Sequence, residues 1–69
     1  MYVVVTEQIY DLILSQFGSD YVYYDDETSE YCVYYQDLID NDYAYQEGDA
    51  IYLYSLRPSE KGVYVGEII

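Results

Sequence analysis

The stretch TEQIYDLILSQFG, residues 6–18, carries a full set of signals for one amphipathic helix and decides the first half of the fold. Thr6 is a residue type that caps helix N-termini, and Glu7 follows in the first turn, where the helix dipole favours an anion. Gly18 is suited to ending the helix. Between them, apolar residues recur at helical spacing, at Ile9, Leu12, Ile13 and Phe17. The sequence therefore predicts a helix over residues 7–17.

Segments on both sides of this helix are rich in β-branched and aromatic residues, which favour strands. Polar or glycine-containing stretches separate these segments and are suited to turns. The predicted strands are residues 2–5, 21–24, 31–35, 50–54 and 63–69. The predicted turns and loops are Asp25–Glu30, Glu47–Asp49 and Arg57–Gly62.

Together these elements predict an α+β fold in which one amphipathic helix packs on an antiparallel sheet of four or five strands. A small, partly open β-barrel with an appended helix is the alternative. Residues 36–41 are ambiguous, because Leu38 and Ile39 could begin a short helical turn or cover one end of the sheet. The chain has 69 residues and no linker, so we expect a single domain over residues 1–69 with a modest core.

Charge is the strongest compositional feature of the chain. Fourteen Asp and Glu face two Lys and Arg, which gives a formal net charge of -12. Such a bias is typical of disordered chains, but 52% of the residues are apolar and 20% are aromatic, so a folded core is expected. Self-repulsion destabilises a compact acidic chain, and solubility alone needs a net charge of only about 2–8. The excess therefore favours a role in binding a cationic partner.

The remaining composition argues against several classes of protein. Histidine is absent and Cys32 is the single cysteine, which excludes an internal disulfide and the commonest metal ligand. We expect a cytoplasmic protein with no membrane segment, because no apolar run reaches the roughly 20 residues that span a bilayer. Cys32 lies in an apolar segment without a visible base, so we predict a packing role for it and no enzymatic activity.

Calcium loops of the EF-hand type do not fit the acidic segments. A loop starting at Asp25 would need Gly at its sixth position and Glu at its twelfth, where this chain has Glu30 and Gln36. A loop starting at Asp40 has Tyr45 at its sixth position. We therefore predict no metal site and no cofactor.

Thirteen tyrosines against one Phe and no Trp indicate a surface role for aromatic rings, since Phe would serve a core without a hydroxyl to satisfy. Alternation in residues 50–54 places Ile51 and Leu53 on one face of the strand and Tyr52 and Tyr54 on the other. Tyrosine is enriched in binding hot spots, and its ring offers a flat face on which arginine can lie. An exposed tyrosine face is also compatible with a homodimer interface.

Small size, acidity and an acidic–aromatic surface resemble phage-encoded DNA-mimic inhibitors, a group that includes anti-restriction proteins, uracil-DNA glycosylase inhibitors and anti-CRISPR proteins. The resemblance implies a protein that blocks the nucleic-acid-binding surface of a host defence protein, with an anti-CRISPR protein as the preferred class. Its partner would be a CRISPR effector subunit, a nuclease or a DNA glycosylase. Direct binding to nucleic acid is disfavoured by the sign of the charge.

The alternative is an acidic interaction module, such as an antitoxin-like partner or a subunit, that binds a basic protein without mimicking DNA. In both cases the predicted partner-binding residues are the dense carboxylates and the exposed tyrosines. They are Asp20, Asp25, Asp26, Glu27, Glu30, Asp37, Asp40, Asp42, Glu47, Asp49, Tyr52 and Tyr54.

Overall fold

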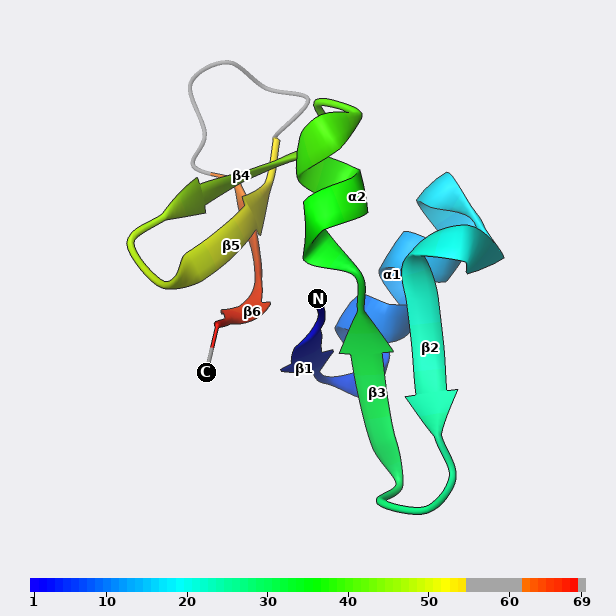
Figure 1. Ribbon diagram of the computed structural model, residues 1–69. Helices are drawn as coiled ribbons and strands as arrows, with labels where there is room; N and C mark the ends of the chain where they lie inside the picture. Colours follow the sequence, from blue (N-terminus) through cyan, green and yellow to red (C-terminus); the bar gives the residue numbers. More distant parts are fainter. Residues whose placement is uncertain (55–61, 69) are drawn as a thin grey trace.

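Strands and short helices alternate along the computed structural model, which describes residues 1–54 and 62–68. In chain order, the elements in Figure 1 are β1 (Val3–Val5), α1 (Glu7–Phe17), the 3-10 helix η1 (Ser19–Tyr21), β2 (Val22–Asp25), β3 (Glu30–Val33), α2 (Tyr35–Asp40), β4 (Ala44–Glu47), β5 (Ala50–Leu53) and β6 (Val63–Glu67).

The predicted helix α1 is present with the expected bounds. The Thr6 hydroxyl accepts a hydrogen bond from the Ile9 amide at 3.2 Å, so Thr6 caps the first turn as its residue type predicts. At the other end, the Gly18 amide donates to the Leu14 carbonyl at 3.2 Å. Gly18 has a φ of 107°, a conformation that glycine adopts without strain.

The strands form two antiparallel sheets of three strands each, so the prediction of a single four- or five-stranded sheet is wrong. The first sheet has the order β1-β3-β2, and the second has the order β4-β5-β6. The mixture of helix and antiparallel sheet that the sequence predicts is confirmed.

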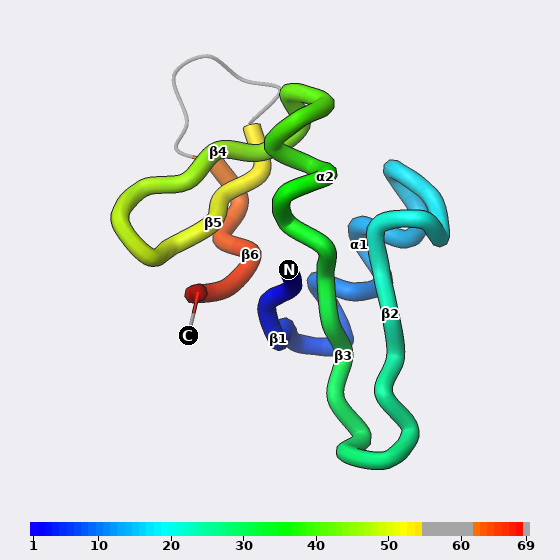
Figure 2. The backbone as a smooth tube through the Cα atoms, viewed as in Figure 1, coloured from blue at the N-terminus to red at the C-terminus, as the bar shows by residue number. Residues whose placement is uncertain are grey.

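The two sheets adjoin where β1 runs beside β6 (Figure 2), yet the described strands show no ladder pairing between these two edges. A β-carbon on Gly66 would lie 3.2 Å from the Val4 carbonyl oxygen, so β6 meets β1 at close range here. A register shift between Ile51 and Tyr52 also leaves Val65 without a partner on β5. Such a bulge bends its strand and increases its twist, which explains why the sheet does not continue across this junction.

The ambiguous segment 36–41 is helical over most of its length, since α2 spans Tyr35–Asp40. Its only described buried side chains are Tyr35 and Leu38, which lie one turn apart and face the core. The strand predicted at residues 31–35 therefore ends earlier, at Val33. Strand β4 was not predicted at all, and it forms a hairpin with β5 through the turn at residues 47–49.

The other predicted strands are present with bounds shifted by one or two residues, and the predicted hairpin over Asp25–Glu30 joins β2 to β3. The loop predicted at Arg57–Gly62 lies outside the described residues except for Gly62, and so does Ile69 at the end of the last predicted strand. Within the described ranges, no helix is long and apolar enough to cross a membrane.

A single hydrophobic core joins the two sheets and both α-helices. Ile13 from α1, Leu38 from α2 and Ile51 from β5 are all fully buried in it. Val3 of β1 and Val65 of β6 complete the core where the sheets adjoin. The core therefore holds the two sheets together across a junction at which no strand ladder does so.

Gly62 is expected to be the glycine least tolerant of a side chain. A β-carbon there would overlap the Leu53 carbonyl oxygen and lie 3.0 Å from the Tyr45 hydroxyl oxygen. We expect Gly62→Ala to lower the free energy of unfolding by about 1–3 kcal/mol, because the clash is with backbone that cannot rotate away. Gly66→Ala, whose closest contact would be 3.2 Å, should cost less. Urea unfolding of both variants checks this order, and equal losses would contradict it.

Candidate interface for a basic partner

The charged side chains on the described surface are all acidic. Thirteen of the fourteen acidic residues are described, all except Glu60, and none of them is buried. Both basic residues of the chain, Arg57 and Lys61, lie outside the described ranges. The described carboxylates therefore face solvent without a neighbouring Lys or Arg from the same part of the chain.

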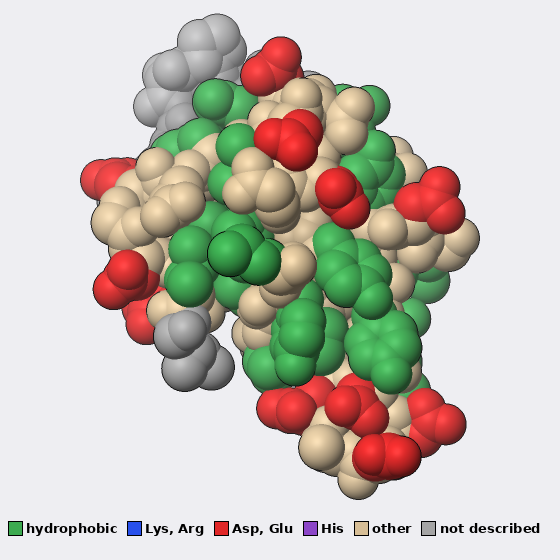
Figure 3. Space-filling view, in the orientation of Figure 1, with side chains coloured by type: hydrophobic (Ala, Val, Ile, Leu, Met, Phe, Trp, Pro, Cys, Tyr) green, Lys and Arg blue, Asp and Glu red, His purple; other side chains and the backbone are tan. Residues whose placement is uncertain are grey.

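The predicted carboxylates fall into four places. Asp20 lies in η1, and a second group lies on or beside the β2–β3 turn, at Asp25, Asp26, Glu27 and Glu30. A third group lies on and after α2, at Asp37, Asp40 and Asp42, and a fourth flanks the β4–β5 turn, at Glu47 and Asp49. Figure 3 shows acidic side chains gathered beyond the first sheet at the β2–β3 turn, with others spread along the rim.

The β2–β3 turn is the densest acidic group, and a side-chain hydrogen bond shapes it locally. The Asp25 carboxylate accepts a hydrogen bond from the Glu27 amide at 3.0 Å, which is an Asx turn. Ser29 has a φ of 57°, so the chain reverses through a left-handed residue before β3 begins. Asp25 and Glu30 are cross-strand partners, and two like charges directly opposite each other destabilise a hairpin. This pair would be relieved by a cation.

Tyrosine rings adjoin these carboxylates on the face of the first sheet turned away from α1. Tyr23, Cys32 and Val4 are cross-strand partners and so share this face, as do Asp25 and Glu30. The Tyr23 and Tyr34 rings lie 6.4 Å apart between centroids. We call the set Tyr2, Val4, Tyr23, Asp25, Glu30 and Tyr34 the acidic–aromatic face. Figure 3 shows a hydrophobic and aromatic band next to the acidic turn.

The electrostatics of this face follow from the same arrangement. The Asp25 carboxylate is the main cause of a raised pKa of the Tyr23 hydroxyl, with smaller contributions from burial and Asp26. Burial, followed by the charges of Glu30 and Asp25, raises the pKa of the Cys32 thiol. Cys32 is only 2% exposed, which confirms its predicted packing role. The shift of Tyr23 therefore reports a local field from Asp25 that disfavours further negative charge and favours a cation.

A second aromatic surface, which we call the tyrosine row, lies on the outer face of the second sheet. The Tyr45 and Tyr52 rings are stacked at 5.5 Å, the Tyr45 and Tyr54 rings lie 5.0 Å apart, and Tyr52 meets Tyr64 at 5.7 Å. Tyr54 is 56% exposed, whereas Ile51 and Leu53 are buried on the opposite face. The alternation predicted for residues 50–54 is thus confirmed.

Strand β6 continues this alternation at its start, because Tyr64 pairs with Tyr52 on the outer face and Val63 pairs with the buried Leu53. Val65 is buried, but Val63 is 43% exposed and Tyr64 is 46% exposed. The register shift comes after Tyr64, because Tyr52 pairs with Tyr64 while Ile51 pairs with Gly66, and Val65 is the extra residue between them.

The other two acidic groups are held by local contacts. On α2, the Gln36 amide donates to the Asp40 carboxylate at 3.0 Å, and Asp42 follows the helix in a left-handed conformation with a φ of 62°. At the β4–β5 turn, the Asp49 carbonyl accepts a hydrogen bond from the Ile68 amide at 2.7 Å. These contacts position the backbone and leave the carboxylates at the surface.

Several residues of the two faces were not among the predicted interface residues. They are Val4, Tyr2, Tyr23, Tyr34, Tyr45 and Tyr64. Period-two spacing could have grouped Tyr23 with Asp25 and Glu30 with Cys32 once the hairpin was recognised. No local signal could have joined Tyr2 to them, since the pairing of β1 with β3 spans the entire helix α1.

Alkaline pH is expected to destabilise the protein. Tyr23, Tyr31 and Tyr64 have pKa values raised above the ordinary 10.0, and Cys32 is raised above 9.0. The unfolded chain therefore loses these protons first, so the stability they contribute is fully present below about pH 9 and is lost as pH rises through the folded pKa values. Urea unfolding at pH 7.5 and 10.5 should give a lower free energy of unfolding at the higher pH.

Cys32→Ala serves as the control for this effect, because it should remove only the part of the loss that begins nearest pH 9. An unfolding free energy that stays constant or rises between the two pH values would contradict the assignment.

Among the described residues, no group of three or more Cys, Asp or Glu side chains is placed to hold a metal ion. What the two faces offer is recognition chemistry: carboxylates as hydrogen-bond acceptors for Lys or Arg, and exposed rings for stacking. Compared with protein-family models, with curated proteins and with solved structures, the chain gives no match.

Proposed function

We propose that this protein binds the basic nucleic-acid-binding surface of another protein and occupies it in place of nucleic acid. The observation that supports this most is the uniformly negative charge of the described surface. It carries thirteen carboxylates, none of them buried, and no described Lys or Arg. Exposed tyrosine rings beside those carboxylates supply flat faces as well as charge. A groove that binds nucleic acid recognises the same two features, negative charge in the phosphates and flat rings in the bases.

The energetics favour such a role over a purely solvating one. Asp25 and Glu30 repel each other across the hairpin, and the chain as a whole carries a net charge of -12. A cationic partner would reduce both the repulsion within this pair and the self-repulsion of the whole chain. These unfavourable terms of the free protein therefore favour formation of the complex. Association should be fast and should weaken as salt concentration rises.

Size and composition favour an inhibitor of the anti-CRISPR kind as the specific form of this proposal. The partner would then be a CRISPR effector subunit, with a nuclease or a DNA glycosylase as the other members of the same chemical class. All three present Lys and Arg side chains along a groove that accepts a phosphate backbone.

An acidic interaction module without DNA mimicry is the second candidate. The distribution of charge favours it, because the acidic groups lie at separate turns around aromatic surface (Figure 3) and do not form one continuous row. An aromatic centre with a charged rim is the usual anatomy of a protein–protein interface.

Competition separates the two candidates. The chain is immobilised, incubated with a host-cell lysate at low salt, and then washed with excess duplex DNA before mass spectrometry of the released proteins. We expect nucleic-acid-binding proteins to be released by duplex DNA. Retained proteins that DNA leaves bound would overturn mimicry and leave the interaction module. An equal wash with DNA-free buffer of the same ionic strength is the control.

A further inference from the structure

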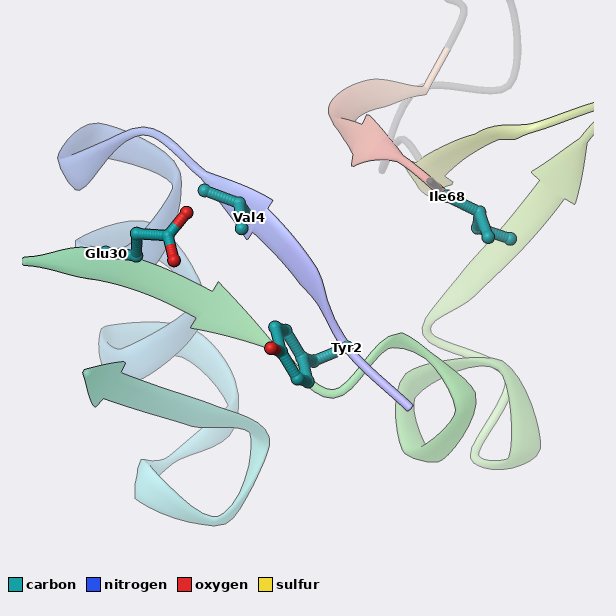
Figure 4. A pocket seen from close by; sticks show the side chains of 4 residues that line it. All are labelled: Tyr2, Val4, Glu30 and Ile68. Carbon is teal, nitrogen blue, oxygen red and sulfur yellow. The ribbon is translucent and has the colours of Figure 1, made fainter. Parts of the chain in front are cut away.

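A hollow of about 380 Å³ opens where the two sheets adjoin, at the edge of the acidic–aromatic face. Tyr2, Val4, Glu30 and Ile68 line it (Figure 4). It exists because β1 and β6 lie side by side without ladder pairing, so the two edges leave space between them. Tyr2 is 56% exposed and Val4 is 36% exposed, so the hollow is open to solvent.

The lining combines one carboxylate with apolar and aromatic walls. Glu30 reaches the hollow from β3, Tyr2 and Val4 come from the N-terminal strand, and Ile68 comes from the opposite side (Figure 4). No described side chain donates a hydrogen bond to the Glu30 carboxylate or forms an ion pair with it. Its charge is therefore not neutralised by the described part of the chain. Asp25 lies directly across the hairpin from Glu30 and adds to the negative potential.

This chemistry selects one kind of ligand. Two neighbouring carboxylates exclude anions, and an apolar ligand would cover the Glu30 charge without compensating it. A guanidinium group matches both the carboxylate and the aromatic ring of this lining. It pairs with a carboxylate through parallel hydrogen bonds, stacks on an aromatic ring, and is less strongly hydrated than an ammonium. The aliphatic stem of an arginine would lie against Val4 and Ile68. At about 380 Å³, the hollow has room for one arginine side chain.

We propose that this hollow is a binding site for a single arginine side chain, presented by a partner protein. The identity of that partner rests on the function proposed above, whereas the arginine site itself does not. Glu30 anchors the guanidinium, Tyr2 stacks on it, and the surrounding carboxylates of the β2–β3 turn steer it in. The site would fix the register of the partner on a surface whose other contacts are long-range and electrostatic.

The test is an NMR titration of the full chain with N-acetyl-arginine amide, with the citrulline analogue as a neutral ligand of nearly the same shape. We expect saturable amide shifts at Val4, Glu30 and Ile68 with millimolar affinity, and binding by citrulline about tenfold weaker or absent. Glu30→Gln should weaken arginine binding about fivefold to tenfold, and Tyr2→Leu about threefold. Circular dichroism confirms that each variant is folded.

Asp11→Asn is the matched control, because it also removes one charge, at an exposed position on α1 that does not line the hollow and does not belong to the β2–β3 turn. It should leave arginine affinity within twofold of the parent. The proposal is overturned if arginine and citrulline shift these amides equally, if Asp11→Asn weakens binding as much as Glu30→Gln, or if no shift occurs at these positions. Because none of these readouts involves DNA or a partner protein, the arginine site can fail while DNA competition succeeds, and the reverse.

Discussion

Reversing the charge of Asp25, Asp26 and Glu27 together, to Lys at all three positions, is expected to weaken binding to the basic partner at least about 100-fold. These residues form the densest acidic group and project from the β2–β3 turn, where they face no described cation. Each reversal turns an attraction into a repulsion, and unfavourable like-charge contacts across an interface cost several kcal/mol. The measurement is isothermal titration calorimetry with the partner that duplex DNA releases from the immobilised chain.

A milder pair of variants shows whether position or total charge causes the loss. Asp25→Asn, Asp26→Asn and Glu27→Gln together raise the net charge by three, from -12 to -9. The matched control places three lysines on the exposed side of α1, at Gln8, Ser15 and Gln16, and gives the same net charge. Asn at position 25 can still accept the hydrogen bond from the Glu27 amide, so the turn is retained.

The hairpin variant should lose at least about tenfold in affinity and the α1 variant less than about threefold. Equal losses would show that only total charge matters and would count against the β2–β3 turn as a contact site.

Leu38→Ala is expected to have the largest effect on stability. Leu38 is fully buried and is, with Tyr35, one of the two described side chains of α2 that are buried in the core. A buried Leu→Ala change costs about 2–5 kcal/mol, and a domain of this length has a total of only about 3–10 kcal/mol. The variant should therefore be largely unfolded near 37 °C, which thermal and urea unfolding will measure.

Leu14→Ala is the matched control, with the same chemical change at a residue that is 38% exposed on α1. It should cost less than about 1 kcal/mol, because little apolar surface and no cavity are involved. If both leucines have the same small effect, α2 does not pack into the core as described, and the link between the two sheets must lie elsewhere.

Local sequence patterns predicted α1 completely and the approximate positions of five of the six described strands, because cap residues, helical spacing and β-branched runs act within a few residues. Strand β4 gave no such signal: only Ala44 of its four residues is buried, and Gln46 and Glu47 are polar and exposed. Helix α2 has six residues, and Tyr34 provides no side-chain cap, so its formation depends on packing of Leu38.

The division into two sheets was hidden from local patterns for a different reason. It depends on the bulge in β6 opposite Tyr52 and on the close approach of Gly66 to β1. Gly66 and β1 lie near opposite ends of the sequence, so no short stretch of sequence contains both. The same long-range arrangement creates the hollow between Tyr2, Glu30 and Ile68. Composition thus indicated what the surface is made of, while tertiary structure determined which carboxylates share a face with which rings.

The most direct test of the proposed function uses fluorescence anisotropy of a labelled DNA duplex bound to the captured partner. Titration with the chain should lower the anisotropy to the value of free duplex at one equivalent per partner, and the lysine-reversed hairpin variant should require at least about 100-fold more protein. Anisotropy that stays at or above the bound value, with the chain shown by co-migration to be in the complex, would mean that chain and DNA bind together. That result would contradict occupation of a nucleic-acid-binding surface by this protein.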